Sequence, residues 1–406
     1  MPTVEKSSAT LGEWFHLKDP TRTTFELDPE RDAEFWCGDP EIRDRLIEAL
    51  RDGLDNGVPH LILFGEYGTG KTHALFHCKW TLEQQERTPR AHCVRIEWSG
   101  FSSRTRFIDV YRETLDRLGL GLVAELIRDH WQTHGRFRIP GDLGDFLEQD
   151  SDLQRALLII AQTNELFVFR APNAKVVLAW RWLKGLALNQ SQRRELNVSA
   201  SLVEEAKPTR LVNLLRMLGY FMARRRDGGR KLILMYDEGE QVDELRRSRD
   251  ALNSFASATR ALFDRSQSEV GVILAFFGAR LEESALIRPD THSRLDQDRQ
   301  VISLPPLATM EKRRDFLDNV LRALVSPGQG PHYPFDAAAR NFFAEHCGRF
   351  GVGLKEERFS FLTGGGEPTA RTVLVALEAV TRAAYNLRER KITTSFMRNR
   401  FDLDAS

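Results

Sequence analysis

The chain has 406 residues, of which 41% are hydrophobic and 29% are charged, and its 58 basic side chains equal its 58 acidic ones in number. Such values are typical of a soluble globular protein with about two or three domains. A net charge of zero excludes a protein that is held to nucleic acid by its overall basic field.

The first predicted elements lead toward a glycine-rich loop. Residues 1–36 are polar and rich in turn formers, which predicts an extended lead-in. A helix is predicted from Pro40, because Asp39 is a good N-cap and proline suits the first helical position. The apolar run 60–64 then predicts a strand, and residues 72–80 predict a helix.

The loop between that strand and that helix predicts a phosphate cradle. It consists of Gly65, Glu66, Tyr67, Gly68, Thr69, Gly70, Lys71 and Thr72, and is followed by His73. Glycines let backbone N–H groups turn toward an anion, and the helix N-terminus adds partial positive charge. We therefore expect ATP here, with Lys71 at the β- and γ-phosphates and the Thr72 hydroxyl on Mg²⁺. The alternative is a plain glycine turn.

The next elements alternate between strand and helix. Residues 92–98 predict a strand and residues 107–118 a helix, and this βαβ pattern is typical of a parallel α/β sheet. A mostly helical stretch at about 119–226 follows. We expect it to be an insertion between two sheet strands that carries specificity.

Residues 231–238 predict a buried strand that ends in two carboxylates, Asp237 and Glu238. In P-loop NTPases an acidic residue at this place organises Mg²⁺, which is the role expected for Asp237. Glu238 can then polarise the attacking water as general base, which favours hydrolysis. The alternative is a strand that simply runs into a polar loop.

The remaining pattern predicts strands at 270–278 and 301–304, then three helices between 310 and 387. The expected domains are a lead-in (1–36), an α/β nucleotide-binding domain (37–308), a helical lid (309–395) and a basic tail (396–406).

Over roughly residues 37–395, this order of elements resembles the AAA+ ATPases, on the side of the replication-origin initiators and the STAND ATPases. Residues 291–299 resemble the element that carries an arginine finger. The resemblance implies that Arg294 or Arg299 reaches the γ-phosphate of a neighbouring subunit in a homo-oligomer. Residues 366–371 resemble the sensor-2 element, which implies that Arg371 senses the γ-phosphate from the lid.

The strand at 270–278 departs from that family pattern. It ends without the usual polar sensor-1 residue, and Arg280 resembles an arginine of the STAND ATPases. Three short features are similar to the ATP-binding proteins of BREX-type phage-defence systems. They are the form of the loop at 65–73, the stretch Trp180–Gly185, and Leu218–Tyr220.

We therefore expect an AAA+ ATPase that hydrolyses ATP to remodel or load a partner protein or DNA, in a BREX-like anti-phage system. The alternatives are a STAND-like nucleotide switch with slow turnover and an ATP-dependent DNA loader of the transposition or replication type.

The two ends of the chain differ in charge. Residues 1–60 carry fourteen acidic and seven basic side chains, whereas residues 371–400 carry seven basic and two acidic ones. Such ends could pair in a head-to-tail ring or face a phosphate backbone, and solvated helix faces are the alternative.

The expected location is cytoplasmic, with no membrane partner. The four cysteines contain no Cys-x-x-Cys pair, and no leader pattern opens the chain. No apolar run approaches roughly 18 residues, the length that a membrane span requires.

Overall fold

A computed structural model describes residues 9–84, 90–98, 105–162, 167–168, 171–200, 202, 207–239, 248–266, 268–278, 297–330, 332–350 and 367–401. The chain divides into two compact units. The first unit comprises Met1–Arg45, Gly65–His77 and Ser303–Ser406, and the second comprises Leu46–Phe64 and Cys78–Ile302. Each unit has a hydrophobic core of its own. The glycine-rich loop thus belongs to the same unit as the C-terminal helices. The expected domain boundaries placed it in the α/β domain (37–308) instead.

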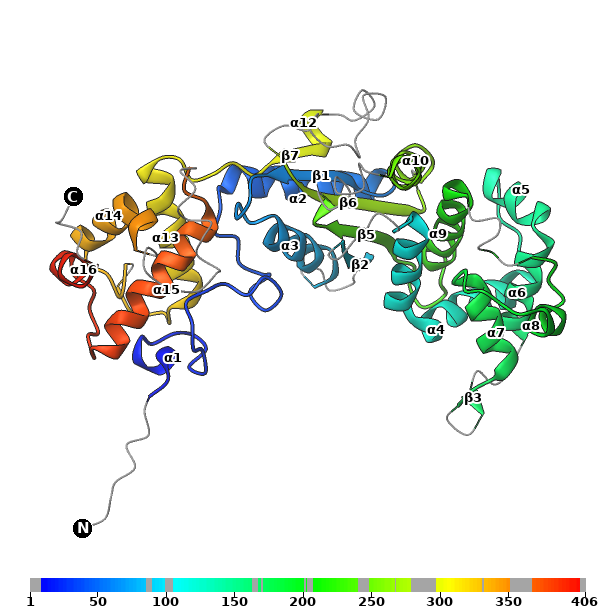
Figure 1. The fold of residues 1–406 in the computed structure, drawn as a ribbon, viewed down its shortest axis with the longest axis horizontal. Helices are drawn as coiled ribbons and strands as arrows, with labels where there is room; N and C mark the ends of the chain where they lie inside the picture. Colours follow the sequence, from blue (N-terminus) through cyan, green and yellow to red (C-terminus); the bar gives the residue numbers. More distant parts are fainter. Residues whose placement is uncertain are drawn as a thin grey trace, which may run out of the picture. The chain divides into compact units, whose positions relative to one another are not determined.

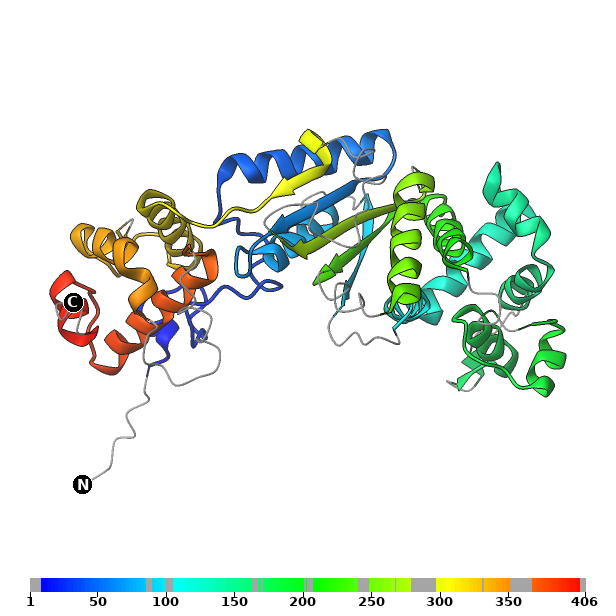
Figure 2. The ribbon, with the colours of Figure 1, turned by 45° about the horizontal axis from the view of Figure 1, so that its top comes forward.

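Five strands form one sheet in the order β2-β5-β6-β1-β7 (Figures 1 and 2). Their bounds are β1 His60–Gly65, β2 Ala91–Glu97, β5 Lys231–Asp237, β6 Val270–Phe277 and β7 Val301–Ser303. Strand β5 pairs in parallel with β2 on one side and with β6 on the other. The predicted parallel α/β sheet is therefore confirmed, and each of its strands lies within a residue or two of the predicted position.

The centre of the sheet is buried on both faces, as its sequence predicts. Every residue of β5 after Lys231 is buried, and in β6 only the last residue, Phe277, is exposed. Continuous apolar runs of this kind are typical of parallel strands that are covered by helices on both sides. The helices outside the insertion that accompany the sheet strands are α2 (Pro40–Asn56), α3 (Lys71–Glu83), α10 (Arg249–Arg265) and α12 (Gln297–Gln300).

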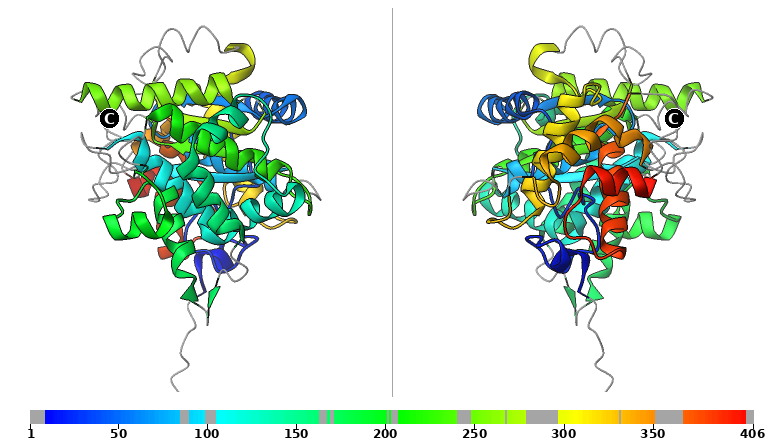
Figure 3. Two further views of the ribbon diagram at one scale, coloured as in Figure 1. Left: turned by 90° about the vertical axis from the view of Figure 1, so that its right-hand side faces the viewer. Right: turned by 90° about the vertical axis from the view of Figure 1, so that its left-hand side faces the viewer.

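The predicted helical insertion lies between β2 and β5 (Figure 3, left). It contains α4 (Phe107–His134), α5 (Asp142–Gln149), α6 (Ser151–Gln162), α7 (Ala174–Leu183), α8 (Gln190–Leu196) and α9 (Pro208–Ala223). A two-stranded hairpin of β3 (Phe167–Val168) and β4 (Ala171–Pro172) joins α6 to α7. Helix α4 continues past the predicted end of its helix, with a kink where Gly119 takes a positive φ of 76°.

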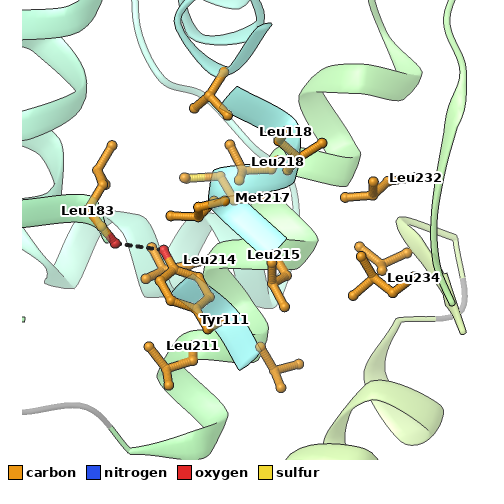
Figure 4. Packing of buried hydrophobic residues seen from close by; sticks show 14 of the residues in the cluster. Tyr111, Leu118, Leu183, Leu211, Leu214, Leu215, Met217, Leu218, Leu232 and Leu234 are labelled. Atoms are coloured by element: carbon orange, nitrogen blue, oxygen red, sulfur yellow. Dashed lines mark hydrogen bonds between the residues drawn. The ribbon is translucent and has the colours of Figure 1, made fainter. Parts of the chain in front are cut away.

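Helix α9 ties the insertion to the sheet. Its residues from Leu211 to Met222 are all buried, and its leucines pack with Leu232 and Leu234 of β5 (Figure 4). The approach to β6 is close, since a Cβ on Gly219 would lie 2.3 Å from the carbonyl oxygen of Glu269. Glycine is therefore required at this point of the helix.

The C-terminal helices of the first unit are α13 (Met310–Leu324), α14 (Ala337–His346), α15 (Ala370–Asn386) and α16 (Thr394–Phe401) (Figure 3, right). A short 3₁₀ turn, Cys347–Arg349, follows α14. Side chains fix two of the helix starts, because Thr309 accepts from the Lys312 N–H and Asp336 accepts from the Ala339 N–H. None of the described helices is long and apolar enough to cross a membrane.

The N-terminal segment differs from the extended lead-in that its composition predicts. It contains α1 (Leu11–Trp14), and Phe15 and Phe25 are fully buried in the core of the C-terminal helices. A buried ion pair between Arg22 and Asp32 closes the segment on itself. Because its apolar residues follow neither a helical nor a strand period, a reading based on period and turn formers misses this packing.

The buried contact between Tyr111 and α7 gives a test of the insertion core. The Tyr111 hydroxyl donates to the carbonyl oxygen of Leu183 at 2.9 Å, in the last turn of α7 (Figure 4). Tyr111→Phe leaves that carbonyl without this donor and should lower the free energy of unfolding by about 1–2 kcal/mol in urea denaturation. The control is Tyr220→Phe on α9, whose hydroxyl makes no hydrogen bond within the described part of the chain. Equal losses in both variants would contradict the assignment.

Candidate functional site

The glycine-rich loop connects β1 to α3, as predicted, and folds around the ammonium group of Lys71. Lys71 Nζ donates to the carbonyl oxygens of Gly65 and Glu66, both at 2.9 Å. The Thr69 hydroxyl donates to the Glu66 carbonyl, also at 2.9 Å. These bonds curl the loop over the first turn of α3, where helix geometry directs N–H groups outward along the axis.

Gly68 and Gly70 of the loop must be glycine for different physical reasons. Gly68 and Gly70 have φ values of 78° and 97°, which side chains rarely adopt. A Cβ on Gly68 would lie 2.7 Å from Thr369 Oγ1 and 2.8 Å from Arg371 Cβ. A Cβ on Gly70 would meet nothing within 4 Å. The backbone at Gly70 therefore faces open space, which fits the close approach of a phosphate group.

Arg371, at the start of α15, contacts this loop. Its backbone N–H donates to the Gly68 carbonyl at 3.0 Å, and its Nη1 donates to the Tyr67 hydroxyl at 2.9 Å. The guanidinium also lies 5.2 Å from the centre of the Tyr67 ring. The structure thus brings together the loop and the predicted sensor arginine within the first unit. The partner residue, Tyr67, was predicted to belong to the cradle, but its pairing with Arg371 was not.

The helix that follows the loop is covered by the N-terminal segment. His73 Nε2 bonds to the Phe35 carbonyl at 2.7 Å, and His77 Nδ1 bonds to the Ala33 carbonyl at 2.8 Å. Burial lowers the pKa of both histidines, against the opposing effect of these carbonyls. Both rings are therefore neutral near pH 7. The side chain of His73 holds the N-terminal segment, and its contribution to ATP binding stays a prediction.

The two carboxylates at the end of β5 lie in the second unit. Asp237 is 2% exposed, and its Oδ2 accepts from Arg95 Nη2 at 2.6 Å. Its Oδ1 accepts from the Glu238 N–H at 3.1 Å. Glu238 has a φ of 58°, a left-handed conformation that is uncommon for a residue other than glycine. The chain therefore turns sharply at this residue, directly after the buried strand.

Sequence reasoning missed Arg95. It lies on β2, and Asp237 is the register partner of Glu97 on the same strand. An arginine between the apolar residues Val94 and Ile96 was the available signal, because a buried carboxylate next to it requires a cationic partner.

These groups have the chemistry that ATP and Mg²⁺ require. Open space at Gly70 and the start of α3 fit phosphate oxygens. A threonine hydroxyl and a carboxylate are the hard oxygen ligands that Mg²⁺ prefers, and Thr72 and Asp237 supply them. Lys71, Thr72 and Arg371 belong to the first unit, and Asp237 and Glu238 belong to the second.

The predicted finger arginines are only partly described. Arg299 lies on α12 with its side chain 72% exposed, at 3.8 Å from Asp52 Oδ2. Exposed pairs of this kind contribute little to stability, so the guanidinium can exchange partners at low cost. Arg294, Arg280 and Gly366 lie outside the described residues.

No protein-family model matches the chain, and a search of curated proteins finds no match. Among solved structures the chain is similar to the Orc1 protein of Aeropyrum pernix, in a complex with DNA. The identity is 15% and the TM-score is 0.41, with 95% of this chain and 68% of that chain covered.

The contrast between Gly68 and Gly70 gives a test of the loop geometry. Gly68→Ala adds both a strained φ and two close contacts, and should lower the free energy of unfolding by about 2–4 kcal/mol. Gly70→Ala adds the strained φ alone and should cost about 1 kcal/mol. Urea denaturation of the full chain measures both. A larger loss for Gly70→Ala would contradict the packing of Arg371 on the loop.

Proposed function

We propose that this protein is an AAA+ ATPase that binds ATP with Mg²⁺ and hydrolyses it. The observation that carries the proposal is the loop of residues 65–72. It runs from a buried strand into a helix, with positive φ at Gly68 and Gly70 and with Lys71 folded over its carbonyls. A plain turn requires neither the lysine at that place nor the open space at Gly70.

The roles of the four central residues follow from their chemistry. Lys71 neutralises the β- and γ-phosphates, and Thr72 and Asp237 hold Mg²⁺ and its waters. Glu238 accepts the proton of the attacking water. Support for joint action comes from the sequence, because a phosphate-binding loop and a strand that ends in an acidic residue are the two parts of a P-loop NTPase site.

The arginines complete the proposed chemistry. Arg371 leaves the Tyr67 hydroxyl for the γ-phosphate, and its backbone bond to Gly68 supports this role because it keeps the side chain near the loop. Arg294 or Arg299 reaches the γ-phosphate of a neighbouring subunit, where it offsets developing negative charge. The high exposure of Arg299 supports this role. Activity therefore requires a homo-oligomer.

The proposed task is remodelling or loading of a partner protein or DNA in a BREX-like anti-phage system in the cytoplasm. Its support is the three short sequence features at 65–73, 180–185 and 218–220. The buried Trp182 and the buried residues Leu211–Met222 of α9 serve the core of the insertion, so any partner contact falls to the exposed residues around them.

A STAND-like switch with slow turnover is a second candidate function. The observation that favours it is Phe277, the last residue of β6, which is 47% exposed at a place where a polar sensor residue is expected. A phenyl ring cannot orient water or hydrogen-bond a γ-phosphate. ATP would then stay bound for long periods, and the protein would signal through the conformation of its ATP-bound state.

A DNA loader is a third candidate. It is favoured by exposed basic residues at the end of the chain, namely Arg388, Arg390, Lys391, Arg398 and Arg400. Contacts with phosphates through such residues would weaken steeply as the salt concentration rises.

Two substitutions separate ATP binding from turnover. Lys71→Ala removes a charge-assisted contact and should weaken ATP binding by about tenfold to a hundredfold. Glu238→Gln keeps the shape of the side chain and should leave ATP bound while lowering kcat by about 10²–10⁴. Binding is measured with a fluorescent ATP analogue and turnover by phosphate release. Unchanged binding by Lys71→Ala overturns the site, and slow parental turnover that is insensitive to Glu238→Gln favours the switch.

Assembly is tested by analytical ultracentrifugation with and without ATP. We expect the parent protein to form a larger species with ATP. Arg299→Ala or Arg294→Ala should assemble and yet lose phosphate release by about 10³ or more, as for other arginines that act in trans. Adding duplex DNA at two salt concentrations identifies the loader through a salt-sensitive complex. A protein that stays monomeric in every condition contradicts the role of both arginines.

A further inference from the structure

The guanidinium group of Arg95 lies between two carboxylates in the second unit. Arg95 Nη2 is 2.6 Å from Asp237 Oδ2 and 3.7 Å from Glu97 Oε2. The two carboxylates differ in environment, since the Asp237 side chain is 3% exposed and that of Glu97 is 42% exposed. Arg95 thus holds the buried carboxylate closely, with the exposed one as a second partner within reach.

The pairing has a direct consequence for a cation that approaches Asp237. Oδ2 accepts from Arg95 and Oδ1 accepts from the Glu238 N–H, so each carboxylate oxygen already has a donor. Each oxygen has a further lone pair, so a donor alone does not exclude a cation. A divalent cation on Oδ2 would nevertheless lie next to the guanidinium, and it would either displace that group or bind against its positive charge. Charge repulsion at such short range persists at physiological salt, because it acts within one Debye length.

We propose that Arg95 competes with Mg²⁺ for Asp237 and transfers to Glu97 when Mg²⁺ arrives with the nucleotide. Arg95 is then a positioning residue that holds the Asp237 side chain in place in the absence of metal. Glu97 is its receiving partner. The exchange makes metal binding depend on the nucleotide, since Mg²⁺ alone supplies too few contacts to displace a guanidinium that is bonded to a buried carboxylate. This inference rests on the proposed function, because it takes Asp237 as a residue that holds Mg²⁺.

Substitutions of Arg95 and of Glu97 should shift the Mg²⁺ requirement of nucleotide binding in opposite directions. Arg95→Gln removes the competing charge, so the Mg²⁺ concentration at half-maximal nucleotide binding should fall by about threefold to tenfold. Glu97→Gln removes the receiving carboxylate, so that concentration should rise. Arg95→Lys keeps the charge and should stay close to the parent. A merely structural role for Arg95 moves stability without producing this pair of opposite shifts.

The experiment titrates Mg²⁺ against each full-length protein at a fixed concentration of a fluorescent ATP analogue, from an EDTA-containing buffer. The matched control is Arg90→Gln, which removes the same charge just before β2, where Arg90 pairs with Asp55 at 2.7 Å. We expect the control to match the parent. An unchanged or higher Mg²⁺ requirement in Arg95→Gln overturns the proposal, as does a lower one in Glu97→Gln.

A second measurement uses the parent protein alone, so it tests the proposal even if one of the variants does not fold. Mg²⁺ alone at millimolar concentration should leave the melting temperature of the parent protein unchanged, whereas Mg²⁺ with the ATP analogue should raise it. A rise with Mg²⁺ alone overturns the competition. Failure of the proposed function gives a different result, since the parent would then bind no nucleotide at any Mg²⁺ concentration.

Discussion

The sheet that is buried on both faces is the constraint on which the rest of this structure depends. Its central strands consist almost entirely of buried residues, so polar chemistry can occur only where those strands end. The glycine-rich loop begins where β1 ends, and Asp237 is the last residue of β5. The apolar core thus defines the places where charged side chains gather, and the turns after the strands decide how those side chains are presented.

The charged groups at these places are already paired in the protein alone. Lys71 bonds to two carbonyls of its own loop, Asp237 bonds to Arg95, and Arg371 bonds to Tyr67. Burying a charge without a partner costs several kcal/mol, which explains the partner of the buried Asp237. Arg371 is exposed, so its bond to Tyr67 is a surface contact. Ligand binding in our proposal is therefore an exchange of partners, and its net free energy is the difference between two sets of contacts.

The two units illustrate how differently a sequence encodes a core. In the second unit, the central strands are continuous apolar runs and several helices follow an apolar period, and these patterns give their positions. In the first unit, part of the core comes from a segment without such a period, where Phe15 and Phe25 pack against distant helices. That segment also bonds to His73 and His77 through backbone carbonyls, so it serves the helix after the loop as well.

The sequence by itself determined the strands, the helical insertion, the loop with Lys71 and Thr72, and the carboxylates Asp237 and Glu238. These features are local, because a turn or an apolar pattern depends on residues that are close together in the sequence. Only the tertiary structure decided that Arg371 packs on Gly68 and Tyr67, and that Arg95 is the partner of Asp237. Such pairs join residues that are 142 to 304 positions apart, and spacing along the chain carries no record of them.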